Sequence, residues 1–204
     1  MSSLPYQIIV APFEVYLSVV GENFPAIDTA DPTSGTNWEL LGTNGNLDYS
    51  DDGVTVTHEQ TIQMHHFLGT TGPRKASRTE EQLLVEFTLH DLTLEEYAKI
   101  LNDATVTTTA ASSGTAGDKA INLLQGFSVS TWAMVIKGDG PYGADWKMQY
   151  EVPMVIRDGS PAVTFNKAEP AGLAFTFRAL EDPNNPTAAS RFGVLRAQHA
   201  DALA

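Results

Sequence analysis

The side chains best suited to metal binding or proton transfer are five histidines, His58, His65, His66, His90 and His199. A protein metal site needs about three or four ligands that converge on one point. His65 and His66 are adjacent, so in a strand their side chains would point to opposite faces. His58 could approach Glu59 or Asp91, but their spacing matches no known metal motif. The pattern favours histidines at a surface or rim, and we predict neither a metal nor a cofactor.

Motifs of hydrolytic enzymes are missing from the sequence, which contains no G-x-S-x-G, no Walker A and no H-E-x-x-H pattern. The stretch GTTGPRK at 69–75 resembles a phosphate-binding loop. It lacks the Lys-Ser/Thr pair and the strand–loop–helix setting, which favours a mobile basic loop instead. Glutamates that could form a glycosidase pair are Glu14, Glu59, Glu80, Glu81, Glu86 and Glu151. Because any acidic β-protein offers such pairs, we predict that the chain is not an enzyme.

The charge balance excludes other classes of function. The 204 residues include 12 Lys and Arg against 25 Asp and Glu, for a formal net charge of −13. A general nucleic-acid binder or a protein that docks on anionic lipid would need a basic surface. The chain has no cysteine, which excludes disulfides and a thiol nucleophile. No signal peptide is visible and no apolar run reaches the roughly 18 residues of a membrane span, so we expect synthesis in the cytoplasm and no membrane partner.

The elements that would position these residues are mainly strands. Apolar and polar residues alternate with a period of two, which is typical of half-buried antiparallel strands. The clearest runs are 13–20, 53–62, 82–90, 146–157 and 173–180. Pro153 cannot donate to a strand ladder, so it predicts an edge or a bulge. One helix is expected over 94–101, with Thr93 as N-cap and Glu96 completing a capping box.

These elements predict one domain over residues 1–204, an antiparallel β-sandwich or barrel-like fold with one packed α-helix. A long inter-strand loop over about 63–80 greatly exceeds the usual hairpin loop of about two to five residues, which indicates either function or disorder. A small polar stretch at 105–117 is expected to be a flexible surface loop. The ends are expected to form an amino-terminal arm over about 1–12 and a carboxy-terminal extension over about 183–204.

Several polar residues are predicted on strand faces turned away from the core. They are Glu59, Glu86, Gln149, Glu151 and Thr176. One interpretation is a solvated outer sheet. The other is an inner surface, shared between subunits, that must not bind a passing polyanion.

The order of elements resembles that of the major tail tube proteins of long-tailed (siphophage-type) bacteriophages and gene transfer agents. The strand pair 53–62 and 81–90 encloses the long loop, and the helix follows directly. The stretch YEVPMVIRDGSP…GLAFTFRALEDP is similar to the strand–turn–strand that closes such proteins. The opening APFEVYLSVVGENFP followed by WELLGTNG is similar to the family's first strand, loop and second strand. The resemblance spans most of the chain, and none of its parts is a catalytic motif.

The resemblance implies a structural virion protein. Its hexameric rings would stack into the phage tail tube, a conduit for DNA ejection into the host. Inner strands of the subunits would close into one continuous β-barrel, so that their edges vanish by assembly. The implied partners are other copies of the chain, the tape measure protein, and the proteins at the tail end and tip, while DNA passes through the lumen without specific binding. The implied location is the virion, after assembly in the host cytoplasm.

On this basis the five polar residues on the outer strand faces are expected to line the lumen. The basic residues Arg74, Lys75 and Arg78 of the long loop would pair with acidic residues of the next ring. The alternative for these three is a solvated charge cluster. The alternative for the whole chain is a β-sandwich adhesin or a receptor- or glycan-binding module.

Overall fold

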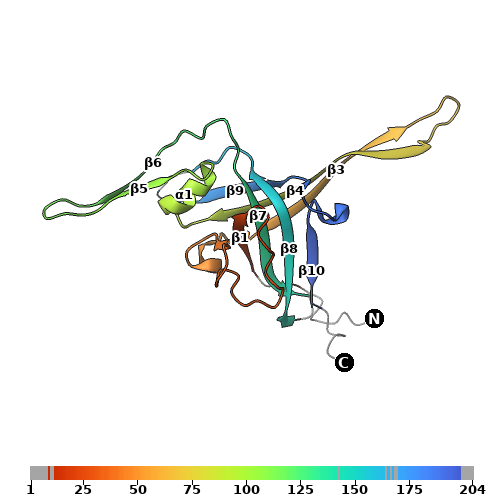
Figure 1. Cartoon of the computed structure of the whole chain (residues 1–204). Coiled ribbons are helices and arrows are strands. Elements are labelled where there is room, and N and C mark those ends of the chain that lie inside the picture. The colour runs from red at the N-terminus through yellow and green to blue at the C-terminus, as the bar shows by residue number, and fades with distance from the viewer. Residues whose placement is uncertain are drawn as a thin grey trace.

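The structure, a computed structural model, describes residue 9 and residues 12–141, 143–163, 165, 167 and 170–198. The described residues are mainly β, with 44% in strands and 8% helical (Figure 1). The strands are β1 (Phe13–Val19), β2 (Glu39–Leu40), β3 (Thr55–His65), β4 (Lys75–Leu89), β5 (Val106–Thr109), β6 (Asp118–Ile121), β7 (Thr131–Gly140), β8 (Gly143–Arg157), β9 (Leu173–Ala179) and β10 (Val194–Ala197). The helices are α1 (Leu94–Ile100) and two short 3-10 turns, η2 (Gly45–Asp48) and η3 (Ala188–Ser190).

One eight-stranded antiparallel sheet makes the body. Its order is β2-β1-β7-β8-β9-β4-β3, and β10 pairs with β8 beside this path. Strand β8 pairs with β7 along most of its length, whereas on its other edge Met148 to Glu151 pair with β10 and Val155 to Arg157 pair with β9. The long strand β8 therefore belongs to both halves of the sheet, which can face each other across a common core. The predicted antiparallel, sandwich-like β-fold with one helix is confirmed.

The core between the two halves is aromatic and aliphatic. Phe87, Phe175 and Phe177 stack with ring centroids 5.1–6.1 Å apart, and Trp132 meets Phe177 edge-on at 6.2 Å. They come from β4, β9 and β7, so the contact joins both halves of the sheet. The alternation read from the sequence explains this packing, because each strand sends every second side chain into the core.

A bulge lies where Pro153 predicts one. Trp132 of β7 lies opposite Val155, but Met134 lies opposite Val152. Two residues of β8 therefore face a single residue of β7, which is the arrangement of a β-bulge. The prediction from Pro153 is confirmed.

The face of β1, β7 and β8 that points away from the aromatic core is covered by the connection 20–38. Trp38 donates from its indole nitrogen to the carbonyl of Asn23 at 3.0 Å and packs against Phe24 at 5.7 Å. Tyr16, Ala133 and Val135 complete this second apolar cluster beneath the connection. The body thus buries both faces of these three strands.

Helix α1 begins as predicted, but only half of the capping box forms. The hydroxyl of Thr93 accepts from the backbone nitrogen of Glu96 at 3.2 Å. The Glu96 carboxylate does not return to Thr93; it accepts from the backbone nitrogen of Gly42 at 3.2 Å. Burial raises the pKa of Glu96, because an ionised carboxylate is less well solvated there. The helix is therefore tied to the β2–η2 connection through this side chain.

Two β-hairpins project from opposite sides of the body (Figure 1). The longer is the outer part of β3 and β4, paired from Thr61 opposite Glu80 to His65 opposite Lys75. The shorter is the two-stranded sheet of β5 and β6. The predicted inter-strand loop over 63–80 is shorter in the structure, because β3 continues to His65 and β4 begins at Lys75, so that cross-strand pairing turns half of it into a ribbon. The prediction of a flexible loop at 105–117 is wrong for the same reason over 106–109.

Other predicted elements have mixed outcomes. The expected amino-terminal arm falls almost entirely outside the described residues, as does the end of the carboxy-terminal extension. Within that extension, residues 194–197 form β10, and Asn185 accepts from the backbone nitrogen of Thr187 at 3.1 Å just before η3.

Candidate functional site

Three of the five polar residues predicted on outward strand faces share one open face. Glu86 of β4 lies directly opposite Thr55 of β3 and Thr176 of β9. Glu59 lies opposite Gln82, which is four residues from Glu86 along β4 and therefore on the same face. Glu59 and Glu86 are exposed and Thr176 is half-buried. The face across β3, β4 and β9 is thus polar, and its register comes from the alternation seen in the sequence.

The cation on this face is neutralised. Arg178 of β9 pairs with Asp158 at 2.6 Å and donates to the side-chain oxygen of Gln82. A backbone hydrogen bond from Gly159 and the Arg178 guanidinium hold the pKa of Asp158 below its usual range. Lys147 of β8, outside this face, pairs with Asp139 at 2.5 Å. Local pairing of Arg178 leaves the carboxylates of Glu59 and Glu86 to set the charge of the open face.

A shallow hollow of about 210 Å³ lies beside Glu86. Its polar lining consists of Ser50, Asp52, Thr55, Glu86, Thr88 and Thr176. Hydroxyls and carboxylates dominate this lining, and no Lys or Arg contributes to it. Such a surface repels phosphate rather than binding it.

The remaining two polar residues are not on an open face, and the prediction of their exposure is wrong. Gln149 is fully buried and Glu151 is 5% exposed. The amide of Gln149 donates to the carbonyl of Pro25 at 3.0 Å and to the Glu151 carboxylate at 2.7 Å. Glu151 also accepts from Arg196 of β10 at 2.7 Å. Both residues therefore hold the 20–38 connection and β10 against β8.

Burial of these two residues was not visible in the alternation of β8. The alternation correctly predicts that Gln149 and Glu151 share a face opposite Val152. It does not indicate which part of the chain covers that face. The covering pieces are the irregular connection 20–38 and the four-residue strand β10, whose positions depend on contacts far apart in the chain.

The predicted basic residues lie on the long hairpin. Arg78 donates to Gln60 at 2.9 Å and pairs with Glu81 at 3.3 Å, both within the same hairpin. Arg74 lies over the Phe67 ring at 5.6 Å, and Lys75 is exposed. Among the described residues Arg74 and Lys75 have no ion-pair partner. Of the three basic residues, these two are the ones available to another molecule.

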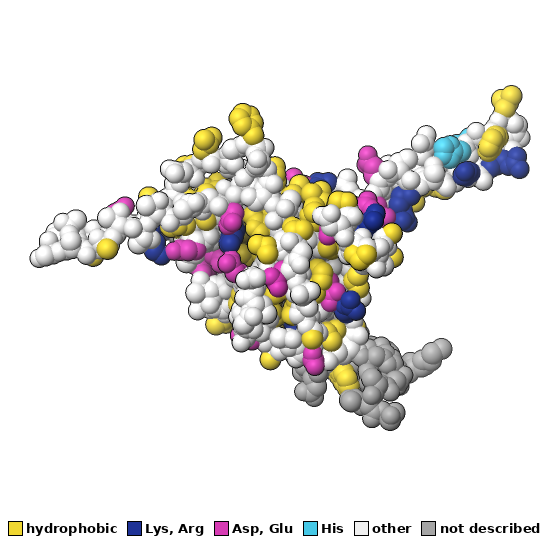
Figure 2. All heavy atoms as spheres, viewed as in Figure 1, with side chains coloured by type: hydrophobic (Ala, Val, Ile, Leu, Met, Phe, Trp, Pro, Cys, Tyr) yellow, Lys and Arg dark blue, Asp and Glu magenta, His cyan; other side chains and the backbone are white. Residues whose placement is uncertain are grey.

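Sequence reasoning missed the apolar character of this hairpin. Its exposed apolar side chains are Ile62, Met64, Phe67 and Leu68, of which Leu68 is fully exposed. Figure 2 shows hydrophobic and basic side chains together at the hairpin tip, while acidic side chains lie mainly over the body. The sequence signal for it is HHFL beside GPRK, of which the prediction of a basic loop uses only the second part. A combined apolar and basic tip is suited to binding an acidic surface.

No group of three or more His, Asp or Glu side chains in the described part of the chain could hold a metal ion. No helix among the described residues is long and apolar enough to cross a membrane. The sequence matches no protein-family model and none of the curated proteins compared with it.

Proposed function

We propose that this chain is a self-assembling tail tube subunit, which forms hexameric rings that stack into the tail of a bacteriophage or a related particle. The observation that carries the proposal is the long hairpin. No residue from 61 to 81 is buried, and from Lys75 to Leu83 strand β4 pairs only with β3 among the described residues. A two-stranded ribbon without a packed face is marginally stable in water. Contact with another subunit would supply the missing burial.

The polar face of β3, β4 and β9 supports the second part of the proposal, a conduit for DNA. DNA carries one negative charge per roughly 1.7 Å of helix axis, and basic side chains bind it strongly. A lumen lined by Glu59, Glu86 and hydroxyls would let it pass. Because β3 is the edge strand of the sheet, the same face can continue into a neighbouring subunit once that edge is paired. Thr176 would lie on this lumen, whereas Gln149 and Glu151 would not.

The remaining partners follow from the same proposal. The tube would enclose the tape measure protein and end on the tail-end and tip proteins. The subunit would assemble in the host cytoplasm and remain in the virion.

The direct test is the state of the purified protein. We expect negative-stain microscopy to show rings or hollow tubes, and mass measurement to give particles that are multiples of a six-subunit ring. Purification at raised concentration favours the assembled state by mass action. Persistent monomer at all concentrations, or rings with another subunit number, would contradict the proposal. A stable monomer with glycan affinity would favour the adhesin alternative.

A charge reversal tests the lumen. Replacing Glu59 and Glu86 together by Lys should leave tubes intact, since both side chains are exposed. The new cations should attract phosphate, so short linear DNA should sediment with the tubes at low salt and release at high salt. The matched control is the Glu59→Gln, Glu86→Gln pair, which should retain no DNA. Retained DNA that nuclease still digests would place these side chains on the outer wall and refute the lumen assignment.

A further inference from the structure

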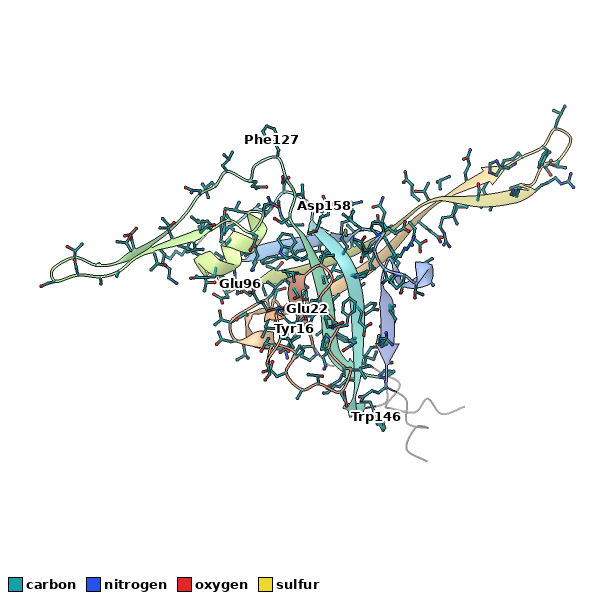
Figure 3. The ribbon with its side chains drawn as sticks, in the orientation of Figure 1. Tyr16, Glu22, Glu96, Phe127, Trp146 and Asp158 are labelled. Carbon is teal, nitrogen blue, oxygen red and sulfur yellow. The ribbon has the colours of Figure 1, made fainter. Side chains whose placement is uncertain are left out.

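The connection between β6 and β7 exposes four apolar side chains. They are Leu123 (70% exposed), Leu124 (87%), Phe127 (108%) and Val129 (60%). The connection, residues 122–130, contains no charged residue. Phe127 points away from the body at the top of this connection (Figure 3). Exposed apolar clusters of this kind mark interaction sites.

A single residue holds this connection in place. The Asn102 amide donates to the carbonyls of Gln125 at 3.0 Å and Ser128 at 2.7 Å, and its side-chain oxygen accepts from the backbone nitrogen of Ser130 at 2.5 Å. Asn102 itself has a φ of 61°, a left-handed conformation that few residues other than glycine adopt. The backbone of the connection is therefore fixed although its apolar side chains are 60–108% exposed. A preformed surface loses less conformational entropy when it binds.

The same chain carries a second apolar patch of matching chemistry. The hairpin tip displays Phe67 and Leu68 beside Arg74 and Lys75. Figure 1 shows the hairpin projecting away from the 122–130 connection, so the two patches do not meet within one chain.

Charge also favours contact between the two patches. Asp103 follows the Asn102 clamp directly and is half-exposed. Lys99 pairs with Asp103 at 3.2 Å and with Glu39 at 2.8 Å, so this group has two carboxylates for one cation. The excess negative charge beside the 122–130 connection complements the unpaired cations of the hairpin tip. The two patches are therefore complementary, since one is apolar with acidic neighbours and the other is apolar with basic neighbours.

We infer that the hairpin tip of one copy docks on the 122–130 connection of another copy, with Leu68 and Phe127 at the centre of the contact. This inference rests on the proposed self-assembly and names the surface that receives the hairpin. Two different patches meet, so the contact is heterologous, and repeating it from copy to copy builds a ring or an open helical array. The 122–130 connection, which Asn102 holds in place, is then a docking platform rather than a surface loop.

The absence of cysteine allows a direct test by cross-linking. Leu68→Cys protein is mixed with Phe127→Cys protein that carries a mobility tag, assembled, and treated with a mild oxidant. Disulfides form only when Cα atoms approach within about 7 Å, so the mixed product reports docking. The matched control is Leu68→Cys mixed with tagged Leu47→Cys, since Leu47 is 86% exposed on η2. Held proximity raises effective concentration, so we expect at least about tenfold more mixed product than in the control.

The outcomes separate this inference from the proposed function. Normal tubes with mixed product no greater than the control would overturn the inference while self-assembly stands, and would mean that another partner covers the connection. Mixed product above the control in small oligomers, without rings or tubes, would support the docking and contradict the tube. Neither assembly nor mixed product would contradict both. As a second measurement, Asn102→Ala should lower the mixed product several-fold without unfolding the subunit, because it frees the connection but removes no core side chain.

Discussion

Removing the outer hairpin is expected to abolish assembly and leave the subunit folded. The shortened chain replaces residues 62–79 by Asn-Gly, so that Thr61 and Glu80, which already lie opposite each other, flank a two-residue turn. No residue in the removed stretch is buried, so the core between the two halves of the sheet is unaffected. The removed ribbon contributes no buried side chain, so we expect only a small change in the free energy of unfolding.

The reason to expect loss of assembly is that the removed stretch holds every exposed apolar side chain of the long hairpin and all three of its predicted contact cations. Size-exclusion chromatography and negative-stain microscopy measure the assembly, and circular dichroism checks the fold. A matched variant keeps the hairpin but changes Arg74 and Lys75 to Glu; it should assemble only weakly, because the tip would then repel an acidic neighbour. Tubes of normal length from the shortened chain would show that the hairpin is not an assembly element.

The strands of the body were predictable because each carries its own evidence of burial. In β4, Leu83, Val85 and Phe87 alternate with polar residues, and the same rule applies to Phe175 and Phe177 in β9. Slipping either strand by one residue would expose these aromatic and aliphatic side chains, so the register is strongly specified. This is also why Glu59, Glu86 and Thr176 could be assigned to one face from the sequence. Their shared face follows from local pattern plus strand pairing.

The hairpins were not predictable in the same way. Cross-strand pairing at His65 opposite Lys75 satisfies backbone groups but buries no side chain, and the only apolar residues that alternate with polar ones there are Ile62 and Met64. The stretch 63–80 therefore looked like a loop. The Asn102 clamp was equally invisible, since one side chain joins residues 23 to 28 positions away. Features held by hydrogen bonds between distant residues leave little periodic signal in a sequence.

Glu86 and Glu151 illustrate this limit, and they give the final prediction. Both alternate with apolar residues in long strands, yet Glu86 is exposed and Glu151 is 5% exposed. Replacing Glu86 by Lys should change the free energy of unfolding by less than about 0.5 kcal/mol, because water solvates either charge. Replacing Glu151 by Lys should lower it by about 3–5 kcal/mol, because a buried charge then loses its partners.

The structural reason lies in what Glu151 contacts. Its carboxylate accepts from Gln149 and from Arg196 at 2.7 Å each, and it raises the pKa of that guanidinium. A lysine at this position would face Arg196 with like charge and would leave the Gln149 amide with only the Pro25 carbonyl. Urea unfolding of the two variants measures the difference in their free energies of unfolding. The m-value is fitted separately for each variant. The Glu151→Gln variant, which keeps an acceptor but no charge, should fall between them with a loss of about 1–3 kcal/mol. Equal stability of the two Lys variants would mean that β10 and the 20–38 connection do not cover Glu151 in solution, and that Gln149 and Glu151 belong with the open polar face after all.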